Sequence, residues 1–207
     1  MESAHELRQP RLWLGALALG QPLLSTGLSD QEQAWAQELS PSRRQEFSCT
    51  RALVRRQLGR WLHCSPLAVP LQAPPSVYPT LGEGLGVVSW SHSCGHLLLG
   101  WSARPLGVDL ESCGRRLKVR SLLPRLCSAQ ECELWRQWPE PVVEQLMLQR
   151  WVQLEALVKR QRSSLAAELG RGPAQLAEQS VALPLSLAAQ RWWVGWSGGA
   201  VPVVETD

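Results

Sequence analysis

Two carboxylates close together in the middle of the chain could bind a hard cation. Asp109 and Glu111 stand in the segment G-V-D-L-E at residues 107–111. If this segment is a strand, both side chains face the same way, because alternate residues of a strand point to one side. Carboxylate oxygens suit Mg²⁺, which typically takes one or two protein carboxylates together with phosphate oxygens. Taken alone, the pair can equally be the solvated face of a half-buried strand.

Glu155 and Lys159 form a second pair, in the segment W-V-Q-L-E-A-L-V-K at residues 151–159. Four residues apart on a helix, they share a face, and an ordinary surface pair of this kind contributes about 0.3–0.5 kcal/mol. Glu155, however, lies only about 40° around the helix from Trp151, at the edge of the apolar stripe. A glutamate in that place, beside an ammonium group, can serve as a metal ligand or a general base near a phosphate.

A third polar group, Ser91-His92-Ser93, directly follows a short apolar run at residues 86–90. A histidine in a turn after a strand can be purely structural, or it can hydrogen-bond a phosphate from the loop. The order of the three groups along the chain is more specific than any one of them.

The composition is that of a folded protein, with 44% hydrophobic and 19% charged residues and a net charge of +3. Arg dominates the basic residues and is scattered, which favours phosphorylated ligands over a nucleic-acid stripe. The six cysteines form no CxxC pair, so reduced thiols are expected rather than a disulfide framework. An apolar stretch at residues 12–24 is too short to cross a bilayer; we interpret it as a buried strand rather than a signal peptide and expect a cytoplasmic protein.

Helices and strands are expected in both halves of the chain. Ser29 and Ser128 each precede a glutamate by three residues, which predicts two capping boxes. The expected helices begin at these serines, at Pro41 and at Pro141, and the last of them continues to about Leu169. The expected strands cover residues 12–19, 86–90, 97–101, 106–110, 191–196 and 200–204. Each half therefore combines strands with helices, which indicates an α/β (α+β) fold.

The motif order resembles that of the 4′-phosphopantetheinyl transferases, and specifically the larger two-lobed type that activates surfactin synthetase. The resemblance is carried by Ser-His-Ser after a strand, by G-V-D-L-E and by W-x-x-x-E-A-x-x-K, and it extends to R-x-x-F-x-x-x-R at residues 44–51. It implies two similar lobes related by a pseudo-twofold axis, each with a small antiparallel sheet packed on helices. The N-terminal lobe would comprise residues 1–104, and residues 105–207 would form the lobe that carries most of the metal site.

The resemblance also implies a reaction: Mg²⁺-dependent transfer of 4′-phosphopantetheine from coenzyme A to a serine of an acyl or peptidyl carrier protein, releasing 3′,5′-ADP. Asp109, Glu111 and Glu155 would bind the metal ion, and Glu155 would also be the catalytic base. Lys159 would contact the coenzyme A pyrophosphate. The other coenzyme A phosphates would be bound by Ser91 and His92, with either Arg44 or Arg51 at the 3′-phosphate. A monomer without membrane or nucleic-acid partners is expected.

Three positions depart from the family pattern. Ser89-Trp90 replaces Asn-Leu before Ser-His-Ser, Leu154 replaces a basic residue, and Val77-Tyr78-Pro79 stands roughly where the family has Gly-Lys-Pro. They motivate one alternative, a catalytically inactive paralogue that binds coenzyme A or a nucleotide. A second alternative is an Arg- and Trp-rich nucleic-acid binder. The carrier protein would belong to fatty-acid, polyketide, nonribosomal-peptide or glycolipid synthesis.

Overall fold

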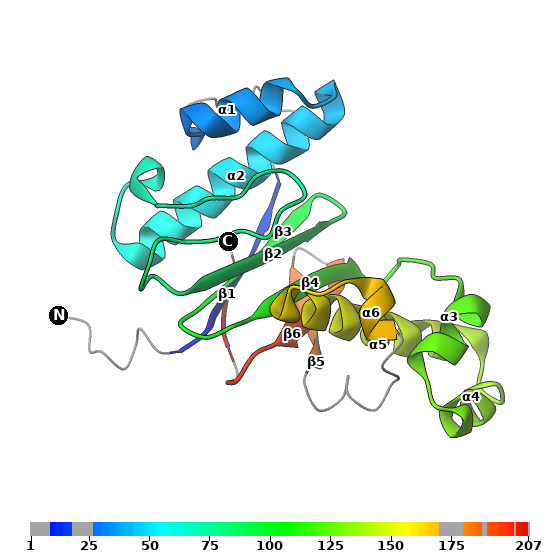
Figure 1. Ribbon diagram of the computed structural model, residues 1–207. Helices are drawn as coiled ribbons and strands as arrows, with labels where there is room; N and C mark the ends of the chain where they lie inside the picture. The colour runs from blue at the N-terminus through cyan, green and yellow to red at the C-terminus, as the bar shows by residue number, and fades with distance from the viewer. Residues whose placement is uncertain (1–8, 18–26, 170–179, 188–189, 201, 207) are drawn as a thin grey trace.

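A computed structural model describes residues 9–17, 27–169, 180–187, 190–200 and 202–206, and has an α+β fold in which two small sheets pack against helices (Figure 1). This confirms the predicted fold class. The elements, in chain order, are β1 (Arg11–Ala16), α1 (Asp30–Gln37), α2 (Pro41–Leu62), the 3-10 turn η3 (Pro66–Ala68), β2 (Val87–Ser93), β3 (His96–Ser102), β4 (Gly107–Ser112), α3 (Val119–Leu126), α4 (Ala129–Trp135), α5 (Glu140–Gln161), α6 (Leu165–Leu169), β5 (Val181–Leu187), β6 (Gln190–Ser197) and β7 (Val203–Thr206).

The helix starts follow the sequence signals. In both predicted capping boxes the serine hydroxyl accepts the backbone N–H three residues on, and the glutamate there accepts the serine N–H. Pro41 occupies the first turn of α2, where its missing N–H needs no partner. The predicted helix to Leu169 is wrong in its second part. Arg162 has a left-handed φ of 52°, which ends α5 at Gln161, and the short α6 follows.

The first sheet has the strand order β2-β3-β1-β7, and the second has the order β4-β6-β5. In the first sheet β1 runs antiparallel to β3 but parallel to β7, so this sheet is mixed rather than antiparallel as predicted. Strand β7 comes from the second half of the chain, yet it completes the sheet of the first half. There Glu205 accepts hydrogen bonds from Trp61 Nε1 at 3.1 Å and from Gln57 at 3.2 Å. The division at residues 104/105 and the pseudo-twofold relation stay predictions.

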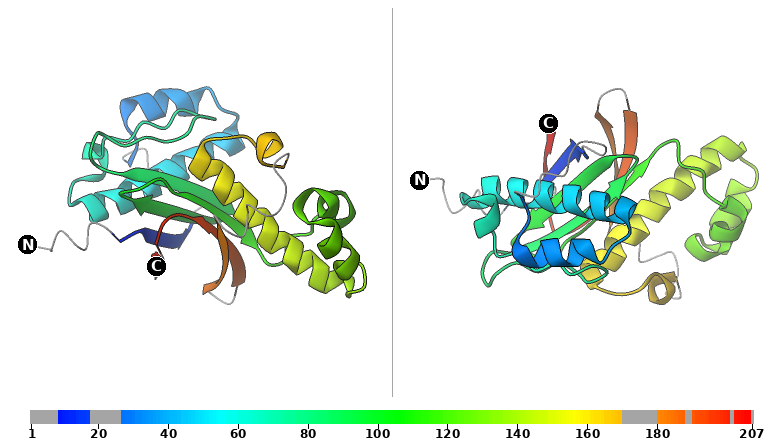
Figure 2. Two further views of the ribbon diagram at one scale, coloured as in Figure 1. Left: turned by 60° about the horizontal axis from the view of Figure 1, so that its bottom comes forward. Right: turned by 90° about the horizontal axis from the view of Figure 1, so that it is seen from above.

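Alternation along the strands distributes their side chains between separate cores. On β1, Trp13 packs towards α2, whereas Leu12 and Leu14 join the apolar cluster between the two sheets, with Val108 and Leu110 of β4. The helix α5 packs its own apolar side against α3 and α4 in a third cluster. Seen from above, α2 and α5 both lie over the strands (Figure 2), and below them β2 packs against β4.

Several elements differ from expectation. Ser91-His92-Ser93 was expected in a turn but completes β2, because the hairpin turns one residue later at Cys94 and Gly95, which have φ of 46° and 74°. Strand β5 and helix α3 were not predicted. The predicted first strand is observed as far as Ala16, and residues 18 and 19 lie outside the described residues.

No disulfide joins the six cysteines, all of which are described. Among the described helices, none has the length and apolarity needed to cross a membrane.

Two glycines let α5 lie directly on the second sheet. A Cβ atom at Gly107 would stand 1.9 Å from the backbone oxygen of Ala156, and one at Gly195 would stand 1.9 Å from that of Val152. Gly107 and Gly195 belong to the neighbouring strands β4 and β6. Since both contacts are with helix backbone, no side-chain rotation can relieve them. The close approach of α5 brings Glu155 and Lys159 to the face of β4 that carries Asp109.

Gly107→Ala is expected to destabilise the protein by about 1–3 kcal/mol, because the added methyl group must push α5 away from β4. Urea unfolding measures the loss. Gly199→Ala is the matched control, since a Cβ there meets no atom within 4 Å, and its stability should stay within about 0.5 kcal/mol of wild type. Equal stability of the two variants would contradict the close-packing account.

Candidate active site

Three serines of β2 face β4 and hold its polar groups. The Ser91 hydroxyl donates to Asp109 Oδ1 at 2.7 Å, and the Ser93 hydroxyl donates to Glu111 Oε2 at 3.0 Å. The Ser89 hydroxyl accepts a backbone N–H of β4 at 3.2 Å. Because residues two apart on a strand share a face, the alternate serines meet the alternate carboxylates. The two carboxylates are therefore fixed by neighbouring strands rather than free in solvent.

Lys159 reaches Asp109 from α5. Its Nζ donates to Asp109 Oδ1 at 2.8 Å and to the Val108 carbonyl at 3.0 Å. Asp109 itself is only 3% exposed, and its second oxygen, Oδ2, is buried without a hydrogen-bond partner. Burying a carboxylate oxygen unpaired is unfavourable, so a cation or a donor bound beside Oδ2 would be stabilised. This is the feature of the site that best fits a bound metal ion.

Glu155 lies close enough to Asp109 and Lys159 for their charges to act on it. Burial raises the pKa of Glu155 above the ordinary value of 4.5, the negative charge of Asp109 raises it further, and Lys159 and Arg115 act in the opposite direction. A carboxyl group with a raised pKa is a better proton acceptor near neutral pH than an ordinary glutamate. Glu155 thus has the environment expected of a general base.

The raised pKa of Glu155 predicts a pH effect on stability in metal-free buffer. Above 4.5 the unfolded chain releases the Glu155 proton before the folded protein does, so the unfolding free energy falls as pH rises through the raised pKa. Glu155→Gln lacks this titration and should lose less stability over the same range. Urea unfolding from about pH 4 to pH 8 tests this, with the exposed Glu133→Gln as control. Parallel profiles for wild type and Glu155→Gln would contradict the prediction.

Glu111 is paired with Arg115, whose guanidinium also lies 5.6 Å from the centre of the Trp151 ring. In the described part of the chain, no three His, Cys, Asp or Glu side chains are grouped closely enough to hold a metal ion. The carboxylates instead contact the cationic side chains of Lys159 and Arg115. The donor chemistry of Asp109, Glu111 and Glu155 still fits Mg²⁺, and the unpartnered Asp109 Oδ2 is an available ligand atom.

Beside the carboxylates, two adjoining pockets of about 220 and 340 Å³ form a groove. They share Arg51, Ser76 and Trp90. The smaller one also contains His92, and the larger one extends to Tyr78 and Lys159. The groove therefore runs from His92 past a buried arginine to the lysine that contacts Asp109. Its cations and aromatic rings suit an anionic ligand with an aromatic group, and the one carboxylate that these pockets contain, Glu46, is paired with Arg43 and His92.

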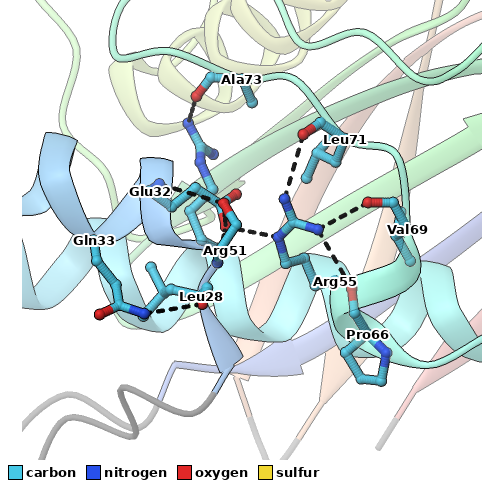
Figure 3. A network of polar contacts seen from close by, with 10 residues as sticks. Leu28, Glu32, Gln33, Arg51, Arg55, Pro66, Val69, Leu71 and Ala73 are labelled. Atoms are coloured by element: carbon cyan, nitrogen blue, oxygen red, sulfur yellow. Dashed lines mark hydrogen bonds and ion pairs between the residues drawn. The ribbon is translucent and has the colours of Figure 1, made fainter.

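Arg51 places a buried positive charge in the wall that the two pockets share. Its guanidinium lies 4.6 Å from the ring centres of both Phe47 and Trp90, and it donates to the Ala73 carbonyl at 2.8 Å (Figure 3). Burial lowers the pKa of Arg51 to about 10, which leaves it charged at neutral pH. Its Nε is buried without a hydrogen-bond partner. Of the arginines predicted to contact a phosphate, Arg51 is the one that lines the groove.

Residues 105–184 match the model of the 4′-phosphopantetheinyl transferase superfamily. The match begins just before β4 and includes Asp109, Glu111, Glu155 and Lys159. The chain is also 28% identical over 181 residues to the 4′-phosphopantetheinyl transferase HetI of Nostoc sp. (strain PCC 7120), a similarity that covers 84% of this chain and 73% of HetI. Both comparisons support a relationship to the superfamily. The finer resemblance to the type that activates surfactin synthetase stays a prediction.

The remaining predicted residues lie in different places. His92 lines the smaller pocket, with Nδ1 3.2 Å from Glu46 Oε1. Arg44 lies elsewhere: its guanidinium donates to the carbonyls of Ala36 and Gln37 at 3.0 and 2.9 Å, at the end of α1. It is thus engaged in ending that helix and lines neither pocket of the groove. Ser91 contacts Asp109 rather than facing into the groove as a phosphate ligand would.

Sequence reasoning missed the roles of three residues of the site. Ser93 donates a hydrogen bond to Glu111, Arg115 forms an ion pair with Glu111, and Tyr78 lines the groove. The alternation of Ser89, Ser91 and Ser93 was a usable signal, because three small polar residues on one strand face predict a polar neighbour. The sequence carries no comparable signal for Tyr78, whose hydroxyl donates to the Ser163 carbonyl at 2.8 Å across 85 residues.

Proposed function

We propose that this protein transfers the 4′-phosphopantetheine group of coenzyme A to a serine of an acyl or peptidyl carrier protein and releases 3′,5′-ADP. The observation that carries the proposal is the group formed by the buried Asp109 with the partly buried Lys159 and Glu155, which lies inside the segment that matches the superfamily. HetI, by its name, is a 4′-phosphopantetheinyl transferase. We also propose the two-lobed architecture, with residues 1–104 and 105–207 as its lobes, and a cytoplasmic monomer.

In the proposed mechanism, the groove binds coenzyme A through its phosphates. Arg51 supplies a fixed positive charge on the groove wall, and His92 adds a hydrogen-bonding group at the smaller pocket. Lys159 lines the larger pocket and contacts Asp109, and its ammonium group would bind the pyrophosphate. Trp90 and Phe47 hold the Arg51 guanidinium in place, which limits the reorganisation needed on binding.

The carrier serine hydroxyl would attack the phosphorus that bears pantetheine, and the bond from that phosphorus to the leaving 3′,5′-ADP would break. Glu155 would take the serine proton, directly or through one water molecule, and Lys159 would stabilise the charge that develops on the leaving group. Asp109, Glu111 and Glu155 would hold Mg²⁺. When bound, this ion would offset negative charge on the phosphate oxygens.

Release of 3′,5′-ADP tests the proposal. The protein is incubated with coenzyme A, Mg²⁺ and each of several apo carrier proteins, and nucleotide products are separated by chromatography. We expect one 3′,5′-ADP for each carrier modified, and none with a carrier whose acceptor serine is replaced by alanine or when EDTA is present. Intact coenzyme A with every carrier tried would contradict the proposed function.

A further inference from the structure

Both carboxylate oxygens of Glu111 contact other side chains of the protein. The Arg115 Nη1 contacts Oε1, and the Ser93 hydroxyl donates to Oε2 at 3.0 Å. The Glu111 side chain is 12% exposed and that of Arg115 is 40% exposed, so the carboxylate is mostly covered while the guanidinium reaches solvent. A divalent cation that binds Glu111 through Oε1 must therefore compete with Arg115 for the same oxygen atom.

Arg115 also connects the carboxylates of β4 to α5. Its guanidinium packs over Trp151, which stands one helical turn before Glu155. The positive charge of Arg115 acts on Glu155 as well, since it lowers the pKa of that carboxyl against the opposing effect of burial. One arginine therefore contacts one of the three carboxylates that are proposed to bind metal, and its charge acts on a second.

Lys159, the other cationic residue beside these carboxylates, is held more firmly than Arg115. The Lys159 ammonium makes two hydrogen bonds, to Asp109 and to the Val108 carbonyl, and its side chain is 23% exposed on a long helix. Arg115 follows β4 in a turn in which its N–H donates to the Ser112 carbonyl at 2.9 Å. Because its side chain is 40% exposed, against 23% for Lys159, the Arg115 guanidinium can turn to solvent by giving up its contacts with Glu111 and the Trp151 ring.

We propose that Arg115 is a positioning residue that holds Glu111 in the metal-free protein and leaves it when a divalent cation binds. In the metal-free protein it reduces the repulsion among Asp109, Glu111 and Glu155. On metal binding, the cation takes over this role and the Arg115 guanidinium turns to solvent. The inference rests on the proposed function in that it requires the cation site formed by these three carboxylates.

Metal binding without turnover tests the inference, with Mn²⁺ as the probe and electron paramagnetic resonance of free Mn²⁺ as the readout. Arg115→Gln removes the competing charge, and Arg116→Gln is the matched control, since Arg116 is the next residue and is paired with Glu144 away from the cluster. We expect Arg115→Gln to bind Mn²⁺ about three- to tenfold more tightly than wild type, and Arg116→Gln to differ by about twofold or less.

Thermal unfolding gives a second readout. Without metal, Arg115→Gln should unfold at a lower temperature than wild type. Added Mn²⁺ should raise the unfolding temperature of Arg115→Gln by more than it raises that of wild type. The inference would be overturned if wild type and Arg115→Gln bound Mn²⁺ with equal affinity, or if Arg115→Gln and Arg116→Gln both bound it more tightly than wild type by the same factor. Either result would leave the proposed cation site intact. Failure of all three proteins to bind Mn²⁺ would overturn it together with the proposed metal site. Asp109→Asn identifies the site, because it should abolish whatever binding is observed.

Discussion

Replacing Asp109 by asparagine is expected to reduce phosphopantetheine transfer by about 10²–10³-fold, a loss typical of removing one preorganised electrostatic group from an active site. The amide keeps the shape of the side chain and can still accept the Ser91 hydroxyl, but it removes the charge that orients Lys159. It also removes the anionic Oδ2, which is buried without a partner and is the ligand atom best placed for a cation. The reaction should therefore lose metal binding and lysine positioning together.

The rate of holo-carrier formation at saturating coenzyme A measures this loss. Circular dichroism and urea unfolding should show that Asp109→Asn remains folded, because the hydrogen-bond geometry around residue 109 is largely kept. Asp30→Asn is the control and should react at the wild-type rate, because Asp30 is an exposed residue in the first turn of α1. A folded Asp109→Asn protein that reacts within about threefold of wild type would exclude Asp109 from the mechanism.

Replacing Glu32 by alanine is expected to lower the unfolding free energy by about 3–5 kcal/mol, the range for breaking a buried ion pair from one side. Glu32 Oε2 accepts the Arg55 Nε–H at 2.6 Å, and both side chains are at most 3% exposed. Arg55 further donates to the Val69 carbonyl at 2.9 Å and to that of Leu71 at 3.3 Å (Figure 3). Without Glu32, the guanidinium would be left buried and uncompensated beside Arg51.

Urea unfolding again gives the measurement, with Glu133→Ala as control. The Glu133–Arg136 pair is exposed on α4, so its loss should cost no more than about 1 kcal/mol. In the double variant Glu32→Leu, Arg55→Met, part of the stability should return, because the Arg55 charge is removed together with its partner, while the Val69 and Leu71 carbonyls still lose their donor. A Glu32→Ala protein as stable as the control variant would show that the buried pair does not hold this part of the fold.

The Glu32–Arg55 pair also matters for the groove, because Arg55 and Arg51 anchor consecutive parts of one segment. Arg55 binds carbonyls up to residue 71, and Arg51 binds the carbonyl of Ala73, directly before Pro74. Pro74, Ser76 and Tyr78 then line the pocket that reaches Lys159. Loss of the buried pair should therefore weaken coenzyme A binding as well as stability.

Local signals in the sequence predicted much of the fold. The two serine capping boxes and Pro41 located helix starts, because these signals act over three or four residues. Alternation placed Asp109 and Glu111 on one strand face, where the structure has them beside Ser91 and Ser93. Such features need no knowledge of distant residues, so the sequence alone suffices for them.

Features that depend on distant contacts were missed or misplaced. Nothing near residue 203 indicates that β7 pairs with β1, some 190 residues away in the chain. Gly107 and Gly195 gave no signal of their own, since their role is visible only with α5 packed against them. Arg44 matched a family pattern, yet three carbonyls around the end of α1 take up its guanidinium.

The most direct test of the proposed function is the intact mass of an apo acyl carrier protein after incubation with this protein, coenzyme A and Mg²⁺. We predict that the carrier gains the mass of one phosphopantetheine group, and that the gain forms about 10²–10³-fold more slowly when Asp109→Asn replaces the wild type. An unchanged mass on several acyl and peptidyl carriers, by a protein that still binds coenzyme A, would contradict the proposal. It would favour a coenzyme A-binding paralogue that has lost the transfer reaction.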